Sequence, residues 1–418
     1  MTKRQALAGA ALAVTMFVGL AAPASAHGRH DGNRHSEHHS DHDSDNHHGR
    51  DKKHGHNNDG DNNDHGHHGK HHGDDNCGNP CGHDGDEAGT VTVVADNLNN
   101  PRQVTTNDGA VYVAEAGTGG DTCFGTGEDQ ACVGLTGSVT RVRDGDAERV
   151  QTGLFSIGGP EGDVVGLDSL AFRHDRMYGI VTGTCDVPPG APSEFTDQLG
   201  KVLKLEGGTD FDAIGDPSAF ECANDPDGQG ADTDPYGIAV RGDTIYVADA
   251  AGNDIVKVDK HSGEVSLAAV LSNNSQPVPT SLAWGPEGDL YIGTLNFEGG
   301  PGGASVYKLD PDTDQLSVYA SGLTFITGLN FGCNGDLYVS EFSTGFGAMG
   351  PLPDGQVVKI PWGGGTDGRE IIGAGSLHFP TGVAFQDGAL YVSNWGIAPG
   401  TDTTFGPGNH GQLVKITL

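Results

Sequence analysis

The chain has 418 residues, a net charge of −34 and 69 glycines. So large an excess of carboxylates repels phosphate groups, which excludes nucleic acid and anionic membrane surfaces as partners. Length alone suggests two or three domains, and only a repeated pattern argues for one.

The first 26 residues have the three parts of a secretory signal peptide. Lys3 and Arg4 precede an apolar run over residues 6–22, and Ala24-Ser25-Ala26 supplies the small residues of a cleavage site. No other stretch is long and apolar enough to span a bilayer. We therefore predict a secreted, extracellular protein without a membrane span.

Residues 27–89 contain almost no aliphatic or aromatic side chain and hold 16 of the 20 histidines. Such a segment cannot bury a core, so we expect it to be disordered. Paired imidazoles suit Zn²⁺, Ni²⁺ or Cu²⁺. The alternative is a flexible spacer that binds metal without a biological role. The candidate ligands are His47, His48, His67, His68, His71 and His72.

From residue 90 onward, a hairpin pattern recurs six times. In the copy from Val383 to Val392, two apolar runs flank Asp387-Gly388, and Asp-Gly supplies the positive φ angles of a tight turn. Both faces of such a hairpin are apolar, so it must be packed between others like it. Each second run is centred on a tyrosine, namely Tyr112, Tyr178, Tyr246, Tyr291, Tyr338 and Tyr391.

Two further strands follow most hairpins, which gives repeats of about 40 to 50 residues with four strands each. The sixth copy ends at Leu418 without its fourth strand, whereas Val91–Leu98 reads as a fourth strand with none before it. We predict that Val91–Ala95 pairs with Leu413–Thr417, because ring closure removes open sheet edges. The expected fold is all-β, with one monomeric six-bladed β-propeller over residues 90–418.

The seven cysteines fit an oxidising compartment. Cys123 and Cys132 share one loop, and Cys185 can reach Cys222, so two disulfides are predicted. Cys333 lies beside a hairpin turn and is expected to be unpaired. The connectivity of Cys77 and Cys81, in the histidine-rich region, is left open.

The long, variable loops fall on one rim of the predicted propeller, here called the loop rim, which makes it the candidate functional face. Four oxygen-bearing side chains lie three residues beyond repeat tyrosines, where the chain enters this rim: Glu115, Asp249, Glu341 and Asn394. Quasi-symmetry would bring them to the mouth of the central channel, where they could bind a ligand or Ca²⁺. Alternatively, they cap loops by accepting hydrogen bonds from backbone amides.

A second acidic group lies in the link from Asn224 to Gly237. Four carboxylates surround Gly228 there and could wrap Ca²⁺, although their spacing is not that of an EF-hand. A solvated acidic turn is the alternative. The four residues are Asp225, Asp227, Asp232 and Asp234.

Several segments resemble the ScyD/ScyE family of secreted bacterial propellers, which is similar to NHL-repeat proteins. They are NLNNPRQV, VYVAEAGTGG, the Cys123–Cys132 loop, NDPDGQGADTDPYGIAV and PTGVAFQDGALYVSN. The resemblance covers residues 91–418 and implies a six-bladed propeller and export, without an established reaction. More distantly, the architecture is similar to gluconolactonases, streptogramin lyases and PQQ-dependent sugar dehydrogenases. In place of the lactonase E-G-P motif, Glu161-Gly162 is followed by Asp163.

The leading hypothesis is a secreted, non-catalytic propeller that binds a small molecule, an extracellular protein or a glycan through its loop rim, with Ca²⁺ as a candidate cation. A second hypothesis is a metal-dependent hydrolase or lactonase that uses the channel-mouth carboxylates. A third is an envelope protein that scavenges metal through the histidine-rich region. Departures from the lactonase and lyase motifs weigh against catalysis, and no catalytic residue is assigned.

Overall fold

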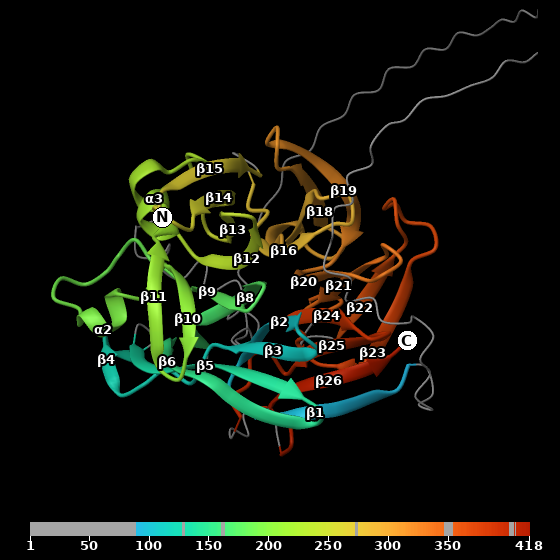
Figure 1. Cartoon of the computed structure of the whole chain (residues 1–418), viewed down its shortest axis with the longest axis horizontal. Coiled ribbons are helices and arrows are strands. Elements are labelled where there is room, and N and C mark those ends of the chain that lie inside the picture. Colours follow the sequence, from blue (N-terminus) through green and yellow to red (C-terminus); the bar gives the residue numbers. More distant parts are fainter. Residues whose placement is uncertain are drawn as a thin grey trace, which may run out of the picture. The chain divides into compact units, whose positions relative to one another are not determined.

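A computed structural model describes residues 89–127, 130–159, 164–271, 275–346, 354–400, 405 and 407–418. The predicted signal peptide, the six candidate histidine ligands, and Cys77 and Cys81 lie outside these residues. All described residues belong to one compact unit. In it, six antiparallel sheets surround a common axis as the blades of a propeller (Figure 1). The predicted all-β, six-bladed fold is therefore confirmed.

Each blade begins with an inner strand beside the axis and adds its next strands outward, so we number the blades in chain order. Blade 1 contains β2 (Pro101–Asn107), β3 (Ala110–Glu115), β5 (Ala131–Arg143) and β6 (Asp146–Gly158), with the short strands β4 (Thr122–Phe124) and β7 (Val164–Val165). Blade 2 contains β8 (Leu167–Arg173), β9 (Arg176–Val181), β10 (Val202–Gly207) and β11 (Asp210–Gly215). Blade 3 contains β12 (Pro235–Arg241), β13 (Thr244–Asp249), β14 (Asp254–Asp259) and β15 (Val265–Val270).

The second half of the ring repeats this order. Blade 4 contains β16 (Pro279–Trp284), β17 (Leu290–Thr294), β18 (Ala304–Asp310) and β19 (Gln315–Leu323). Blade 5 contains β20 (Ile326–Phe331), β21 (Leu337–Glu341), β22 (Gly355–Ile360) and β23 (Glu370–Leu377). Blade 6 contains β24 (Gly382–Gln386), β25 (Ala389–Asn394), β26 (Gly411–Thr417) and β1 (Val91–Leu98). Helices α2 (Ser193–Thr196), α3 (Pro217–Asn224) and η2 (Phe297–Gly299) lie in connections.

The ring is closed as predicted, because β1 forms the outer strand of blade 6 (Figure 1). It runs antiparallel to β26, with Val91 opposite Ile416 and Ala95 opposite Leu413. Leu413 and Ile416 are fully buried. The first strand and the last strand of the propeller thus share one sheet, and neither leaves an open edge beside the other.

The repeated tyrosines join neighbouring blades. In four blades, the ring of the second-strand tyrosine packs against an aromatic ring on the inner strand of the next blade, which adds about 0.5–1.5 kcal/mol beyond area burial for each pair. The ring-centroid distances are 4.6 Å for Tyr112–Phe172, 5.3 Å for Tyr246–Trp284, 4.8 Å for Tyr291–Phe331 and 5.8 Å for Tyr338–Phe385.

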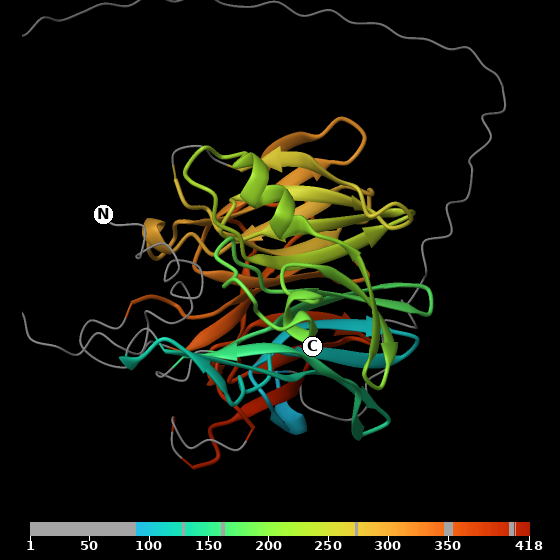
Figure 2. The ribbon, with the colours of Figure 1, turned by 90° about the vertical axis from the view of Figure 1, so that its left-hand side faces the viewer.

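The hairpin turns lie at one end of the strands, opposite the loop rim (Figure 2). Asp108 and Gly109 have φ angles of 48° and 71°, and Asp387 and Gly388 have φ angles of 51° and 76°. These positive angles confirm the tight Asp-Gly turns expected from the sequence, because type I′ turns need positive φ at both central residues.

The two predicted disulfides, Cys123–Cys132 and Cys185–Cys222, are both present and both lie on the loop rim. Cys333 is also disulfide-bonded, so the prediction that it is unpaired is wrong. A position beside a hairpin turn does not prevent pairing, because a disulfide requires only that two Cα atoms approach within about 7 Å in the folded chain.

Candidate functional site

A ring of six equivalent side chains lies at the loop-rim end of the central channel. In blades 1 to 5, this residue follows the one that pairs with the last residue of the blade's second strand, and a β-bulge interrupts the ladder at this position. In blade 6, the equivalent residue directly precedes β24. A bulge redirects a side chain away from the regular alternation of the sheet. The six residues, all buried, are Arg102, Asp168, Tyr236, Thr280, Thr327 and Thr381.

Three of these positions hold threonine, and each threonine joins its blade to the next one. Its hydroxyl donates a hydrogen bond to the backbone carbonyl that precedes the equivalent position of the neighbouring blade. The bonds run from Thr280 to Ile326 (2.7 Å), from Thr327 to Pro380 (2.7 Å) and from Thr381 to Pro101 (2.6 Å). Arg102, Asp168 and Tyr236 replace threonine in blades 1 to 3, so the charged residues of this polar ring, Arg102 and Asp168, lie on one side.

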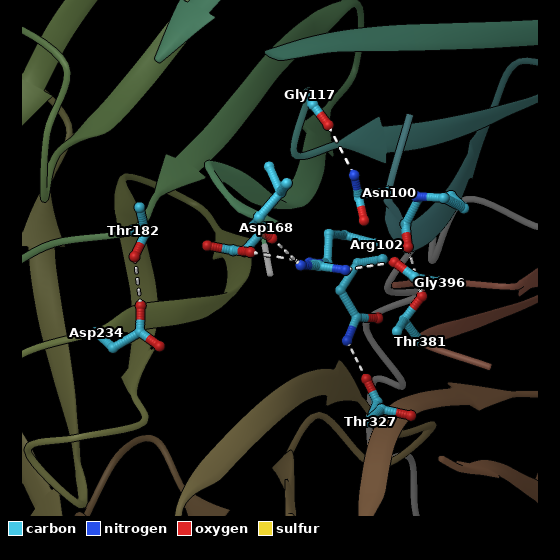
Figure 3. Close-up of polar contacts among 12 residues, drawn as sticks. Asn100, Arg102, Gly117, Asp168, Thr182, Asp234, Thr327, Thr381 and Gly396 are labelled. Atoms are coloured by element: carbon cyan, nitrogen blue, oxygen red, sulfur yellow. Dashed lines mark hydrogen bonds and ion pairs between the residues drawn. The ribbon is translucent and has the colours of Figure 1, made fainter. Parts of the chain in front are cut away.

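Arg102 and Asp168 form an ion pair inside the channel (Figure 3). Nε of Arg102 lies 3.4 Å from Oδ1 of Asp168, and the two side chains are 2% and 1% exposed. The guanidinium also donates to the backbone carbonyls of Gly396 and Val164. Burial raises the pKa of Asp168 well above its ordinary value and the charge of Asp234 raises it further, while Arg102 lowers it.

Gln103 closes the channel beside this pair. Its amide donates to the backbone carbonyls of Thr327 and Thr280, on inner strands of blades 5 and 4. A cavity of about 240 Å³ lies on the hairpin side of Gln103, lined by inner strands. Gln103 and Arg102 are therefore both buried in the channel and hydrogen-bonded to backbone carbonyls of other parts of the ring.

The four residues predicted at the channel mouth share a different arrangement. All are buried, and each accepts a hydrogen bond from a backbone N–H in the link that enters its own blade. Among the described residues, no hydrogen bond joins any two of the four, and their ligand-binding role stays a prediction. The donors are the backbone N–H groups of Asn99 (2.7 Å to Glu115), Asp234 (2.8 Å to Asp249), Thr324 (2.6 Å to Glu341) and His378 (2.6 Å to Asn394).

The four predicted aspartates of the acidic link also have separate partners. Within the described residues, no group of three or more His, Cys, Asp or Glu side chains is arranged as a metal site. Ca²⁺ binding by these four carboxylates together stays a prediction. Asp225 accepts from Gly230 N (3.1 Å), Asp227 from Gln229 N (2.9 Å), Asp232 from Thr233 N (3.0 Å) and Asp234 from Thr182 Oγ1 (2.7 Å).

A pocket of about 270 Å³ opens on the loop rim, between blade 1, the long loop of blade 2 and the end of the acidic link. Its walls are mainly apolar, and the rings of Phe155 and Phe195 meet edge to face at 6.1 Å. Both disulfides border it, because Cys123 precedes the lining residue Phe124 and Cys185 follows the lining residue Thr184.

Among the described residues that line this pocket, none is Lys, Arg or His, and three carry carboxyl groups: Asp186, Asp232 and Asp234. Asp234 is 7% exposed and accepts a hydrogen bond from Thr182, another lining residue (Figure 3). Burial raises the pKa of Asp234 to about 7, with smaller contributions from the charges of Asp249 and Asp232, while Thr182 and Arg102 lower it. The pocket thus joins apolar walls to a negatively charged end.

This raised pKa predicts that the free energy of unfolding falls as the pH rises from about 4 to about 7. Folded Asp234 holds its proton up to a pKa of about 7, compared with an ordinary value of 3.8, so the folded state binds more protons in this window. Urea unfolding at several pH values should show the fall, and Asp234→Asn should make it smaller. The exposed turn variant Asp175→Asn should keep the wild-type dependence, and an unchanged slope in Asp234→Asn would contradict the assignment.

No protein-family model and no curated protein sequence matches this chain. Solved structures resemble its fold. One is a putative glucose dehydrogenase from Thermus thermophilus, with 18% identity, a TM-score of 0.48, and coverage of 78% of this chain and 99% of that chain. Another is the calcium-binding protein regucalcin from Agrobacterium tumefaciens, with 11% identity, a TM-score of 0.45, and coverage of 78% and 93%. A third is virginiamycin B lyase from Staphylococcus aureus, with 13% identity, a TM-score of 0.39, and coverage of 73% and 82%.

The resembling structures are six-bladed propellers of the NHL and SMP-30-like kind, and the likeness concerns the fold alone. Fold and site together define this chain as a six-bladed β-propeller with buried polar side chains in its channel and a pocket on its loop rim.

Across the part of the chain that the structure describes, no helix has the length and apolar character to cross a bilayer.

Proposed function

We propose that this chain is a secreted, non-catalytic binding protein of the ScyD/ScyE type, which holds a small ligand in the loop-rim pocket. The pocket carries the proposal, because mainly apolar concave sites with a few converging polar groups are typical of small-molecule binding. Its apolar walls favour an apolar body, and its three carboxyl groups favour a cationic or hydrogen-bond-donating end. Two disulfides that border the pocket support export to an oxidising compartment.

One of the four predicted rim residues, Asp249, enters this proposal as a support for the pocket. Asp249 accepts hydrogen bonds from the backbone of Asp234 and the hydroxyl of Thr233, both of which line the pocket. Asp249 therefore holds Thr233 and Asp234 in place at the acidic end of the pocket. Metal capture by the histidine-rich region remains a separate, secondary proposal, and neither role requires a catalytic residue.

An apolar amine should bind this pocket better than the matching acid. We expect 4-phenylbutylamine to bind at least about tenfold more tightly than 4-phenylbutanoate, because the carboxylate would lie beside like charges. Isothermal titration of the full chain with both compounds measures the difference. The preference should increase above pH of about 7, where Asp234 is ionised.

Two variants and a control locate the binding. Ala191→Phe fills the pocket and should abolish binding of the amine, whereas Asp234→Asn should reduce the preference for amine over acid. Ala147→Phe introduces the same ring at an exposed position of β6, outside the pocket, and should leave binding unchanged. Equal affinity for both compounds, or full binding by Ala191→Phe, would rule the pocket out as the ligand site.

A further inference from the structure

Glu221 and Asp254 form a second buried acidic group, which the sequence patterns did not indicate. Glu221 lies in α3 and Asp254 is the first residue of β14. They are 1% and 0% exposed. Neither oxygen of either carboxylate has a hydrogen-bond partner among the described residues. The two groups face each other closely enough to share a hydrogen bond once one of them carries a proton.

The surroundings of this pair are acidic as well. A Cβ atom placed on Gly252 would lie 3.0 Å from Oε2 of Glu221 and 3.2 Å from Cγ of Asp249, so these two carboxylates meet above a residue without a side chain. Asp227, 5% exposed, is held nearby by Asn253 Nδ2 at 2.9 Å. The charges that act most strongly on Glu221 and Asp254 come from acidic residues.

Buried carboxylates without donors or counter-charges are strongly unfavourable, so they must be protonated or paired with a cation. Asp249 and Asp227 differ from the pair in this respect. Asp249 accepts from two backbone N–H groups, and Asp227 accepts from Gln229 and Asn253, so both carboxylates have hydrogen-bond donors. Among the described residues of this acidic group, Glu221 and Asp254 lack such donors.

We propose that a hard divalent cation, with Ca²⁺ as the probe, binds between the carboxylates of Glu221 and Asp254. Ca²⁺ takes six to eight oxygen ligands and accepts backbone carbonyls and water beside carboxylates, so two side-chain ligands are compatible with it. The site differs from the four-aspartate link predicted from the sequence. It would tie α3, whose Cys222 is disulfide-bonded to Cys185 in the pocket loop, to the first residue of β14 in blade 3.

The competing state is the protonated pair without a cation. Burial first, and neighbouring acidic charges second, raise the pKa of Glu221 to about 8 and that of Asp254 to about 9. Without a cation, the pair therefore holds protons at neutral pH. Cation binding must release them, and this release distinguishes a cation at this pair from weak binding at exposed carboxylates, which are already ionised.

The test compares the thermal stability of the full chain in a chelator and in about 1 mM Ca²⁺, the range of extracellular calcium modules. The wild-type Tm should rise by about 5 °C in Ca²⁺. Glu221→Gln and Asp254→Asn should each abolish the shift. Glu264→Gln removes an exposed carboxylate from the same blade and should retain it.

Calorimetric titration of wild-type protein with Ca²⁺ in two buffers of different ionisation enthalpy measures the proton release and does not depend on the variants folding. Release at pH of about 7 supports the site. The proposal fails if Ca²⁺ releases no protons, if the wild-type Tm is unchanged, or if both variants keep the full shift. If Ca²⁺ leaves the Tm unchanged, but acidification raises the Tm of the wild type and not that of Asp254→Asn, the pair is protonated and binds no cation.

Discussion

Replacing Arg102 by methionine is expected to destabilise the propeller by about 3–5 kcal/mol, because it leaves a buried carboxylate without its counter-charge. Arg102 is the cation that acts on both Asp168 and Asp234, and it lowers the pKa of each. Its guanidinium also donates to carbonyls of Gly396 and Val164, and these would lose their donors. Urea unfolding of the variant and the wild type measures the difference.

Two comparisons separate charge from packing. Arg102→Met combined with Asp168→Leu should recover most of the loss, since an apolar pair of similar volume often matches a buried ion pair. Arg143→Met breaks an exposed pair with Asp108, where the arginine side chain is 42% exposed, and should change stability by at most about 1 kcal/mol. If Arg102→Met were no more damaging than Arg143→Met, the buried pair would not be holding blades 1 and 2 together.

The fold could be predicted from the sequence because its information is periodic. A tight turn followed by a tyrosine in the second strand recurs in each blade. In four blades this tyrosine packs against the next blade in the same way. A pattern repeated six times can be recognised even where one copy departs from it. Closure by Val91–Leu98 followed from the same count of strands.

The candidate site depends on the exceptions to this pattern, which is why less of it could be predicted. Arg102, Asp168 and Tyr236 stand where other blades have Thr280, Thr327 or Thr381, and comparing the inner-strand segments PRQ, LDS, PYG, PTS, ITG and PTG would have shown the difference. The residues predicted at the ends of the second strands instead accept hydrogen bonds from backbone N–H groups of the links between blades. Strand-end carboxylates commonly serve such local hydrogen bonds, so their presence alone is a weak signal of a ligand site.

The pocket and the Glu221–Asp254 pair could not be found by pattern at all. The pocket brings together loops of blades 1 and 2 and the link before blade 3, and loops have no shared period. Glu221 lies near Asp254 because α3 packs beside blade 3, whereas in the sequence the acidic link and two strands, β12 and β13, separate the two residues. Both features lie where the repeat is interrupted, which is where a propeller can differ from others of its architecture.

Deleting residues 91–98 from the full chain is expected to unfold the propeller at ambient temperature. The deletion removes the partner of β26 and exposes Leu413, Val414 and Ile416, each at most 1% exposed in the closed ring. Their burial contributes about 5–9 kcal/mol, which is comparable with the whole stability of a typical domain. Far-ultraviolet circular dichroism and thermal denaturation measure the loss.

A deletion of equal length, residues 60–67 in the histidine-rich region, is the matched control and should leave the Tm of the propeller unchanged. A synthetic peptide of residues 89–100 should restore cooperative unfolding to the 91–98 deletion, because it supplies the missing edge strand in trans. Loss of stability in the control, or a stable ring without β1, would contradict the dependence of the fold on this closure. Rescue by the peptide would show that β26 can still pair with the sequence of β1, in which Val91 lies opposite Ile416 in the intact chain.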